Sequence, residues 1–407
     1  MNYSESLKWL YGTQQYGIKP GLKIIQRLLN VLGVHGSNQR FIHVAGTNGK
    51  GSVCAMLDSI GRAAGLSTGL FTSPHLVSFR ERIQLNGQMI SETEVASRLS
   101  IIADLIITWE SYPTFFEITT ALALDFFQCN DADLVILETG LGGRLDATNI
   151  ITPIVSVITA IDLDHTAWLG SSIEAIAAEK GGIIKSGIPV LSVPQQEAAA
   201  QVLVRLAHEK NAVLEFVTQP IEDYPIGLTG SHQKLNATLA VKSLQAGGIQ
   251  ISEQAIRYGL KEIFWPGRFQ SLKNNRFILD GAHNEAAAKR LVQTWQEVFG
   301  TEKPVIILGI LKDKDMESIC RALQPMATGF ILVPVHNPRT SQPDELQTIL
   351  HQINPDTDCK IASNFAHAIS LTESLTMKTL VTGSLFLIGE ALAYFNEAGI
   401  TQELSSQ

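Results

Sequence analysis

Residues 41–52 have the sequence Phe41-Ile42-His43-Val44-Ala45-Gly46-Thr47-Asn48-Gly49-Lys50-Gly51-Ser52, which is the most informative segment for the architecture of the amino-terminal part of the chain. It begins with a mostly apolar run, which predicts a short buried strand over 41–45. The glycines that follow let the backbone turn sharply and approach a ligand closely. Small and apolar side chains then recur at helical spacing over 52–64. The predicted order is strand, glycine loop and helix.

This order suits a phosphate, because a helix N-terminus offers unpaired N–H groups and the positive end of the helix dipole. Lys50 would reach the outer phosphates, and Thr47 or Ser52 could face a metal. The spacing departs from the pattern G-x-x-x-x-G-K-[ST], since the first glycine is Gly46 and Gly51 follows the lysine. A flexible glycine turn is the alternative. The combination of strand, glycines, lysine, hydroxyl and helix favours phosphate binding.

Length and composition limit the class of protein. A chain of 407 residues is long enough for two or three domains with an ample core. Hydrophobic residues make up 45% and charged residues 17%, as in ordinary soluble globular proteins. The formal net charge is -8 and no basic run is present, which argues against a broad nucleic-acid-binding surface.

Three further features predict a cytoplasmic protein. The cysteines Cys54, Cys129, Cys320 and Cys359 are far apart and form no CxxC pair, so we expect reduced thiols that mostly pack in the interior. Residues 1–10 lack a basic start followed by an apolar core, so we expect no secretion signal. No uncharged apolar run reaches about 18 residues, so we expect no membrane span.

Polar residues follow three more predicted strands, at the ends where open parallel sheets bind ligands. The strand over 66–71 leads into Thr72-Ser73-Pro74-His75-Leu76, the strand over 134–138 ends in Glu138, and the strand over 154–161 leads into Asp162-Leu163-Asp164-His165-Thr166. An acidic residue that closes a strand beside a phosphate loop typically holds Mg²⁺. For Glu138 a structural ion pair is the alternative. The cluster of Asp162, Asp164 and His165 suits a second metal or a substrate amine, and a place in the core is the alternative for His165.

Other segments stay ambiguous on their residues alone. The polar run 13–16 lies where two amino-terminal helices separate, as a loop would. Phe115 and Phe116 are more typical of a core than of a ligand platform. Lys180 lies in the last turn of a helix over 173–180, where a lysine normally complements the helix dipole. Ser91 and Glu94 predict a capping box at the start of a helix over 91–109.

The carboxyl-terminal part alternates regularly between strands and helices. Strands are predicted at 276–280, 304–309, 329–333, 359–361 and 378–382, with helices at 284–298, 315–324, 343–352, 364–374 and 385–397. This pattern predicts a doubly wound α/β domain with right-handed crossovers. A Pro-Gly break at 266–267 precedes it and predicts a hinge, with domains at 1–266 and 267–407. Ser231–Ala237 opens a helix that could meet a nucleotide base.

Taken in order, the motifs closely resemble those of the folylpolyglutamate synthase/dihydrofolate synthase family, which belongs with the Mur-type ATP-dependent ligases. The segments that carry the resemblance are Gly46–Ser52, Thr72–Leu76, Glu138–Asn149, Leu163–Thr166, Glu179–Ile183, Pro266–Phe269 and Asp280–Asn284. They cover nearly the whole chain, and the third separates the folate branch from the cell-wall branch. The resemblance implies an α/β protein. Its amino-terminal domain is like a phosphate-loop ATPase, with a mostly parallel sheet and flanking helices, and binds ATP and pterin. Its carboxyl-terminal domain is a Rossmann-like, doubly wound ligase domain.

The resemblance also implies roles for the matching residues. Those implied to bind ATP are Thr47, Asn48, Gly49, Lys50, Gly51, Ser52, Asn236, Arg268 and Asp280. Those implied to hold Mg²⁺ at two sites are Ser73, Glu138, His165 and Lys180, the lysine as a carbamate formed with CO₂. Those implied to contact the pterin are Thr13, Gln14, Gln15, Tyr16, Thr114, Phe115, Phe116, Glu117, Leu145, Asp146 and Ala147. The implied catalytic residues are Lys50, Lys180, His165 and His283.

The implied reaction uses ATP to join L-glutamate to dihydropteroate or a reduced folate through an acyl phosphate, in a monomeric enzyme. Residues 114–117 look like those of the bifunctional bacterial type, and an enzyme restricted to polyglutamate extension is the alternative. Two other hypotheses remain. A cell-wall amino-acid ligase would respond to a uridine-nucleotide substrate, whereas a nucleotide-dependent switch would bind ATP without acceptor-dependent turnover.

Overall fold

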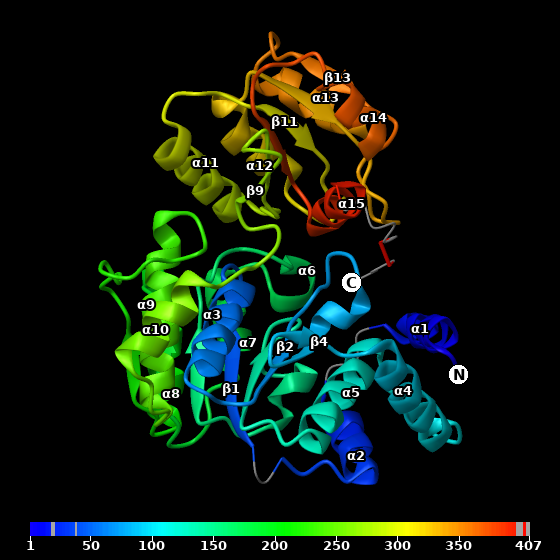
Figure 1. Ribbon diagram of the computed structural model, residues 1–407, viewed down its shortest axis with the longest axis vertical. Coiled ribbons are helices and arrows are strands. Elements are labelled where there is room, and N and C mark those ends of the chain that lie inside the picture. The colour runs from blue at the N-terminus through cyan, green and yellow to red at the C-terminus, as the bar shows by residue number, and fades with distance from the viewer. Residues whose placement is uncertain (18–20, 37–38, 396–401, 404–407) are drawn as a thin grey trace. The chain divides into compact units, whose positions relative to one another are not determined.

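The computed structural model describes residues 1–17, 21–36, 39–395 and 402–403, and these divide into two compact units. The amino-terminal unit contains residues 1–73, 80–227 and 234–263. The carboxyl-terminal unit contains residues 74–79, 228–233 and the chain from Phe264 onward. Figure 1 labels the elements along the chain.

In the amino-terminal unit, the described residues form one sheet of eight strands in the order β4-β3-β2-β5-β1-β6-β7-β8. The strands are β1 (Arg40–Ala45), β2 (Thr68–Phe71), β3 (Ile83–Leu85), β4 (Gln88–Met89), β5 (Leu134–Glu138), β6 (Val155–Ile158), β7 (Val190–Ser192) and β8 (Leu214–Phe216). The six strands from β2 to β8 in this order pair in parallel, and β3 and β4 add an antiparallel edge. The buried strand predicted at 41–45 is confirmed and lies at the centre.

Helices flank this sheet, as Figure 1 shows. They are α1 (Tyr3–Gly12), α2 (Lys23–Leu32), α3 (Lys50–Ala63), α4 (Glu92–Ile106), α5 (Phe115–Cys129), α6 (Thr166–Leu169), α7 (Ile173–Gly181), α8 (Glu197–Glu209), α9 (Ser231–Ala246) and α10 (Glu253–Lys261). Short 3₁₀ turns lie at Thr13–Tyr16 (η1), Phe79–Arg82 (η2) and Ala147–Ile150 (η3). The polar run 13–16 is therefore such a turn rather than an irregular loop. The two amino-terminal helices are predicted to separate near residues 17–20, and residues 18–20 lie outside the described residues.

The carboxyl-terminal unit has its own sheet of six described strands, in the order β13-β12-β11-β14-β10-β9. These are β9 (Gln270–Leu272), β10 (Phe277–Leu279), β11 (Val305–Leu308), β12 (Gly329–Leu332), β13 (Cys359–Ile361) and β14 (Thr379–Thr382). All pair in parallel except β9, which runs antiparallel at the edge. The helices are α11 (Glu285–Phe299), α12 (Met316–Leu323), α13 (Pro343–Ile353), α14 (Phe365–Ser370) and α15 (Leu385–Phe395), with a 3₁₀ turn at Gln324–Met326 (η4).

Both faces of this second sheet are buried. On β11, Ile307 belongs to a core cluster that includes residues of α14 and α15, whereas its neighbours Ile306 and Leu308 belong to a cluster with residues of α11, α12 and α13. Adjacent residues of a strand point to opposite faces, so the two clusters lie on opposite sides of the sheet. Helices on both faces are the arrangement expected of a doubly wound domain. The predicted fold class is confirmed.

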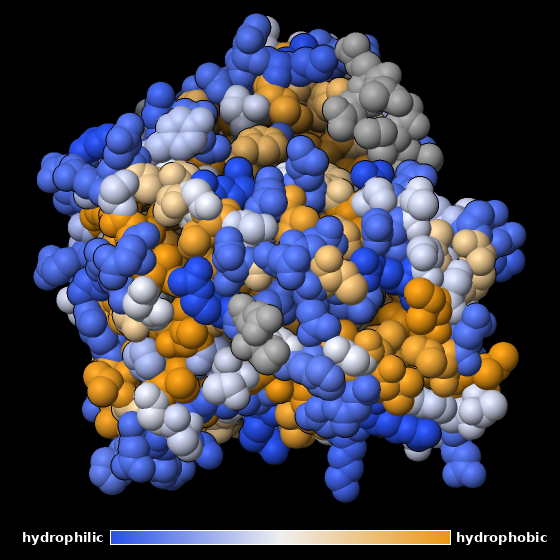
Figure 2. Space-filling view, turned by 60° about the horizontal axis from the view of Figure 1, so that its bottom comes forward, coloured by the Kyte–Doolittle hydropathy of each residue, from blue (hydrophilic) through white to orange (hydrophobic). Residues whose placement is uncertain are grey.

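A helix that crosses a bilayer must be both long and predominantly apolar. No helix within the described ranges is both long and apolar enough to cross a bilayer. On the face drawn in Figure 2, hydrophilic side chains cover most of the area and smaller hydrophobic groups lie between them.

The contact between α3 and α10 gives a prediction about stability. A Cβ atom at Gly259 would lie 2.6 Å from Ile60 Cα, and the Ser59 hydroxyl donates to the Gly259 carbonyl at 2.7 Å. Gly259→Ala should therefore push the helices apart and lower the free energy of unfolding by about 1–3 kcal/mol. Urea denaturation measures the change. Gly12→Ala is the matched control, because a Cβ there meets nothing within 4 Å. Equal stability of the two variants would contradict the prediction.

Candidate active site

The carboxyl ends of four neighbouring strands, β2, β5, β1 and β6, share one edge of the amino-terminal sheet. The loops that leave these strands begin at Thr72, Thr139, Gly46 and Thr159. Most of the residues that the sequence predicts to bind phosphate or metal lie on these loops. The sheet order therefore brings together segments that are far apart in the sequence.

The glycine loop joins β1 to α3, as predicted. Gly46 has a φ of +150°, and a Cβ atom there would lie 1.9 Å from Thr159 Oγ1, so only glycine fits. Gly49 is the N-cap of α3, and Lys50, Gly51 and Ser52 form its first turn. Asn236 of α9 lies beside this turn, since a Cβ atom at Gly49 would be 3.4 Å from Asn236 Oδ1. A loop of this kind at a helix N-terminus can receive an anion.

Asp162 fixes the glycine loop from the neighbouring strand. The Asp162 N–H donates to Thr47 Oγ1 at 3.1 Å, the Thr47 hydroxyl donates to the Asp162 carbonyl at 3.0 Å, and Asn48 Nδ2 donates to Asp162 Oδ2 at 3.2 Å. The backbone N–H groups of Thr47 and Asn48 both donate to the Ala160 carbonyl. Sequence reasoning noticed Asp162 but gave it no role here. The signal was its position just after β6, next to β1 in the sheet.

Lys50 and Glu138 face each other across the ends of β1 and β5. Lys50 Nζ lies 3.9 Å from Glu138 Oε1 and donates to the Thr47 carbonyl at 3.3 Å. Glu138 is buried, and its Oε2 accepts the backbone N–H of Ser73 at 3.0 Å. The predicted phosphate-binding lysine and two of the predicted metal ligands are therefore neighbours.

Lys180 reaches the same loop from the last turn of α7. Its side chain is buried, and Nζ donates to the Gly46 carbonyl at 2.8 Å. Burial, helped by the positive charge of Lys50, lowers the pKa of Lys180 to about 7 against the opposing effect of Asp164, Asp146 and Asp162. Near neutral pH a substantial fraction of this lysine is the free amine, which is nucleophilic.

His165 is arranged differently. It is the exposed N-cap residue of α6 with a φ of +50°, and its Nε2 lies 3.9 Å from Asp164 Oδ1. The described part of the chain contains no group of three or more His, Cys, Asp or Glu side chains that could hold a metal ion. The oxygens of Glu138 and Ser73 are the hard donors that Mg²⁺ prefers, so the donor chemistry fits a magnesium ion beside Lys50.

Two of the predicted pterin residues form a buried capping box at the start of α5. The Thr114 N–H and hydroxyl both donate to Glu117 Oε2, at 2.8 and 2.9 Å, and the Glu117 N–H donates to Thr114 Oγ1 at 3.3 Å. The box sets the direction in which Phe115 and Phe116 leave the helix start. Phe115 stacks on Tyr11 of α1 at 5.6 Å, and the guanidinium of Arg82 lies 5.4 Å from the centre of the Phe115 ring.

Arg82 is a buried cation that sequence reasoning missed. Burial lowers its pKa to about 10, and Tyr11, Glu81 and Glu138 oppose that shift. Its position just before the hairpin strand β3 gave no signal in the sequence. Its burial beside Phe115 places a positive charge in the region of the predicted pterin segments.

The loop after β5 contains the other predicted pterin residues, Leu145, Asp146 and Ala147. Asp146 is buried and N-caps η3, and its carboxylate accepts hydrogen bonds from the Gly140, Leu141 and Thr148 N–H groups and from the Thr148 hydroxyl. Burial raises the pKa of Asp146, and these hydrogen bonds oppose the shift. The ring of Phe116 lies against Gly140, where a Cβ atom would come within 2.5 Å of it.

The remaining predicted pterin residues lie in η1. Thr13 is buried, and its hydroxyl donates to the Leu10 carbonyl at 2.6 Å. Gln14 and Gln15 follow in the same turn. The side chain of Tyr16 is outside the described part of the structure.

The residues predicted from the carboxyl-terminal unit cluster around the end of β10. The buried carboxylate of Asp280 accepts the N–H groups of Phe269 and Ala282, both at 2.9 Å. Burial raises the pKa of Asp280, and the charge of Arg268 opposes the shift. His283 Nδ1 lies 2.7 Å from the Gly281 carbonyl. These contacts shape one turn around Arg268, Asp280 and His283.

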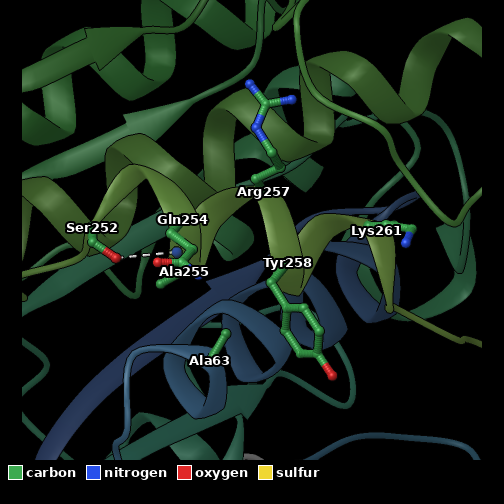
Figure 3. A pocket seen from close by; sticks show the side chains of 7 residues that line it. All are labelled: Ala63, Ser252, Gln254, Ala255, Arg257, Tyr258 and Lys261. Atoms are coloured by element: carbon green, nitrogen blue, oxygen red, sulfur yellow. Dashed lines mark hydrogen bonds between the residues drawn. The ribbon is translucent and has the colours of Figure 1, made fainter.

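A shallow pocket of about 520 Å³ elsewhere in the amino-terminal unit is a weaker candidate. Figure 3 shows its lining side chains on α10 together with Ala63 at the end of α3. Its cations already have partners, since Arg257 Nη1 donates to the Asp223 carbonyl at 3.0 Å and Lys261 Nζ lies 3.5 Å from Glu262 Oε1. The strand ends around Lys50 are therefore the candidate active site.

Comparisons with known proteins show the family of the chain. The Mur ligase middle domain matches residues 44–219, and the Mur ligase glutamate ligase domain matches residues 267–384. The chain is 34% identical to a dihydrofolate synthase/folylpolyglutamate synthase of Bacillus subtilis, covering 95% of this chain and 98% of that one. It is similar to the structure of Escherichia coli FolC in complex with DHPP and ADP, with 32% identity, a TM-score of 0.87, and 96% and 97% of the two chains covered. A bifunctional folylpolyglutamate synthase/dihydrofolate synthase from Yersinia pestis, complexed with AMPPNP and Mn, gives 30% identity, a TM-score of 0.86, and 97% and 98% coverage.

Proposed function

The chain belongs to the dihydrofolate synthase/folylpolyglutamate synthase branch of the Mur ligases, and from this premise we propose that it ligates L-glutamate both to dihydropteroate and to reduced folates. It is an ATP-dependent ligase, as this family is. The observation that carries the proposal is the convergence of Lys50, Glu138 and Lys180 on the glycine loop. An enzyme limited to polyglutamate extension is the alternative.

We propose that the reaction passes through an acyl phosphate. A carboxylate oxygen of the acceptor attacks the γ-phosphorus of ATP, and the bond from that phosphorus to the bridging oxygen breaks as ADP leaves. The glutamate α-amine then attacks the acyl carbon, loses a proton, and phosphate leaves to give the amide. Activation is necessary because joining an amine to a carboxylate in water is unfavourable.

The protein contributes mainly alignment and charge. Phosphoryl transfer is accelerated by preorganised positive groups rather than by covalent help. Lys50 stands at the first turn of α3, and Asp162 holds the glycine loop in a fixed shape. Glu138, Ser73 and His165 would hold Mg²⁺, which neutralises charge on the phosphates. Thr47, Asn48, Gly49, Gly51 and Ser52 would contact ATP, and Asn236 lies beside this loop. The resemblance implies nucleotide contacts for Arg268 and Asp280 as well.

The proposed acceptor site consists of segments 13–16, 114–117 and 145–147. Phe115 and Phe116 offer aromatic faces, and Arg82 offers a buried positive charge that suits an anionic acceptor. The resemblance implies a catalytic role for His283. The shape of this site depends on the Thr114–Glu117 capping box and on Asp146, because both fix backbone that surrounds the aromatic rings.

Turnover with two acceptors tests the proposed function. Purified protein with ATP, Mg²⁺ and L-glutamate should release ADP with dihydropteroate and with tetrahydrofolate, and mass spectrometry should show one added glutamate in each product. Turnover with tetrahydrofolate alone would support the monofunctional alternative. ADP release without either acceptor, or none with both, would contradict the proposal.

We further propose that Lys180 becomes a carbamate that helps to hold a second Mg²⁺. A carbamate forms only from the neutral amine, and burial of Lys180 with a pKa of about 7 favours that form. The neutral fraction rises as pH increases through about 7, so carbamate formation should fall steeply between pH 8 and about pH 6. ¹³C-bicarbonate NMR should show a carbamate signal that disappears over this range.

Lys180→Met should lose that signal. Lys185→Met is the matched control, because Lys185 lies beyond the end of α7 at Gly181 and donates to the Asn149 carbonyl rather than to the glycine loop. The wild-type activity should fall with the signal and recover when bicarbonate is added at pH 7. A signal that survives in Lys180→Met would reject the assignment to Lys180.

A further inference from the structure

His43 lies in the centre of the amino-terminal sheet, where an apolar side chain would be expected. It is fully buried in β1 and pairs with Leu137 of β5 on one side and Ser156 of β6 on the other. Burial, helped by the charge of Lys185, lowers the pKa of His43 to about 3, so the imidazole is neutral. A buried polar ring at this position costs stability unless its hydrogen bonds compensate.

A chain of hydrogen bonds leads from His43 to the loop after β5. His43 Nε2 lies 2.8 Å from Thr148 Oγ1, and the Thr148 hydroxyl donates to Asp146 Oδ1 at 2.5 Å. A hydroxyl has one hydrogen, and here Asp146 receives it. His43 must therefore donate its own N–H through Nε2, which fixes the tautomer of the ring.

The carboxylate of Asp146, held by Thr148, in turn fixes the backbone of the loop after β5. Its Oδ2 accepts the N–H groups of Gly140 and Leu141, both at 2.9 Å. Gly140 follows Glu138 by two residues and packs on the ring of Phe116. The turn that Asp146 holds therefore lies between a proposed metal ligand and a proposed acceptor residue.

We propose that His43 is a positioning residue of the acceptor site, which acts through Thr148 and Asp146 to fix the turn at Gly140 and Leu141. This inference rests on the proposed function and deepens it. His43 touches neither nucleotide nor acceptor in this role. Replacing His43 should therefore weaken acceptor binding rather than slow phosphoryl transfer.

The test compares His43→Leu, which fills the space without a donor, with His43→Gln, whose terminal amide can supply an N–H to Thr148. Thr148→Val and Thr148→Ser form the corresponding pair. His43→Leu and Thr148→Val should raise the KM for the acceptor about tenfold or more while the KM for ATP changes less than about twofold. His43→Gln and Thr148→Ser should stay near wild type. Ser243→Ala, which loses a buried hydroxyl in α9, controls for general destabilisation.

Amide hydrogen exchange provides a readout that does not depend on turnover. Exchange at Gly140 and Leu141 should accelerate in His43→Leu and Thr148→Val but not in Thr148→Ser or Ser243→Ala. ¹⁵N NMR should show His43 as the neutral tautomer with hydrogen on Nε2. If melting temperature falls while exchange at this turn and the KM split stay unchanged, His43 merely fills the core and the proposal is wrong. If wild-type protein turns over neither acceptor, the proposed function fails. The exchange data still show whether the hydrogen bonds from His43 through Thr148 to Asp146 fix the turn at Gly140 and Leu141.

Discussion

Lys50→Ala should lower kcat/KM for ligation by about 10²–10³ or more, without loss of the fold. Lys50 lies in the first turn of α3 with its ammonium 3.9 Å from Glu138 Oε1, where it can meet the outer phosphates of ATP. A positive group that is held in place before the reaction is worth most when charge moves between phosphates. Coupled ADP release with varied ATP measures the loss, and circular dichroism checks the fold.

Lys242→Ala is the control for removal of a lysine. Lys242 forms a surface ion pair with Glu215, so its loss should change ligation little. Near-normal turnover of Lys50→Ala would contradict the proposal that Lys50 and the glycine loop bind the phosphates of ATP.

Glu138→Gln should produce a loss of similar size, about 10²–10³ in kcat/KM, and should raise the Mg²⁺ concentration needed for half-maximal activity. The amide keeps the shape of the carboxylate and can still accept the Ser73 N–H, which now lies 3.0 Å from Oε2. The charge and one acceptor oxygen are lost, so the change removes the interaction with the cation and with Lys50 and keeps the contact to Ser73. Glu138→Ala should abolish ligation as well.

Titration of activity with Mg²⁺ distinguishes a metal ligand from a structural ion pair. If Glu138 were only a structural partner of Lys50, its replacement would lower stability but leave the Mg²⁺ dependence of activity unchanged. Glu302→Gln is the control, because Glu302 pairs with Lys378 on the surface of the other unit. Wild-type Mg²⁺ dependence in Glu138→Gln would contradict its assignment as a ligand.

The sequence predicted the centre of the site because local patterns determine it. A buried strand, glycines and a helix start are contiguous around Gly46, and Glu138 closes its own apolar strand. Parallel pairing then puts the ends of β1 and β5 side by side without further information. Site roles taken from the family resemblance, such as those of Ser73, His165 and His283, remain predictions.

The parts that the sequence did not predict depend on contacts between distant residues. His43 and Thr148 are 105 positions apart, and Thr47 and Asp162 are 115 apart. No local pattern in the sequence indicates contacts between residues so far apart. The strands β8 and β9 were missed because both are edge strands without a fully buried side chain, so no apolar run marks them in the sequence.

Helix ends were also imperfectly predicted. The helices predicted to reach residues 109 and 374 end at Ile106 and Ser370, and the last two residues predicted for α15 lie outside the described residues. At Ser91, the hydroxyl accepts the Glu94 N–H as expected, whereas a complete capping box formed at Thr114 and Glu117, which were predicted only as a substrate segment. Capping depends on a few backbone angles, so the same residue types cap one helix fully and another in part.

The hydrogen bond from Lys180 to the Gly46 carbonyl links the restraint of the glycine loop to the protonation of the lysine. An ammonium is a stronger donor to a carbonyl than a neutral amine, so the 2.8 Å contact restrains the loop most when the lysine is charged. With a pKa of about 7, that restraint weakens over the same range in which the amine gains its reactivity. As pH rises through neutrality, the loss of one proton from Lys180 therefore loosens the glycine loop and makes the amine nucleophilic at the same time.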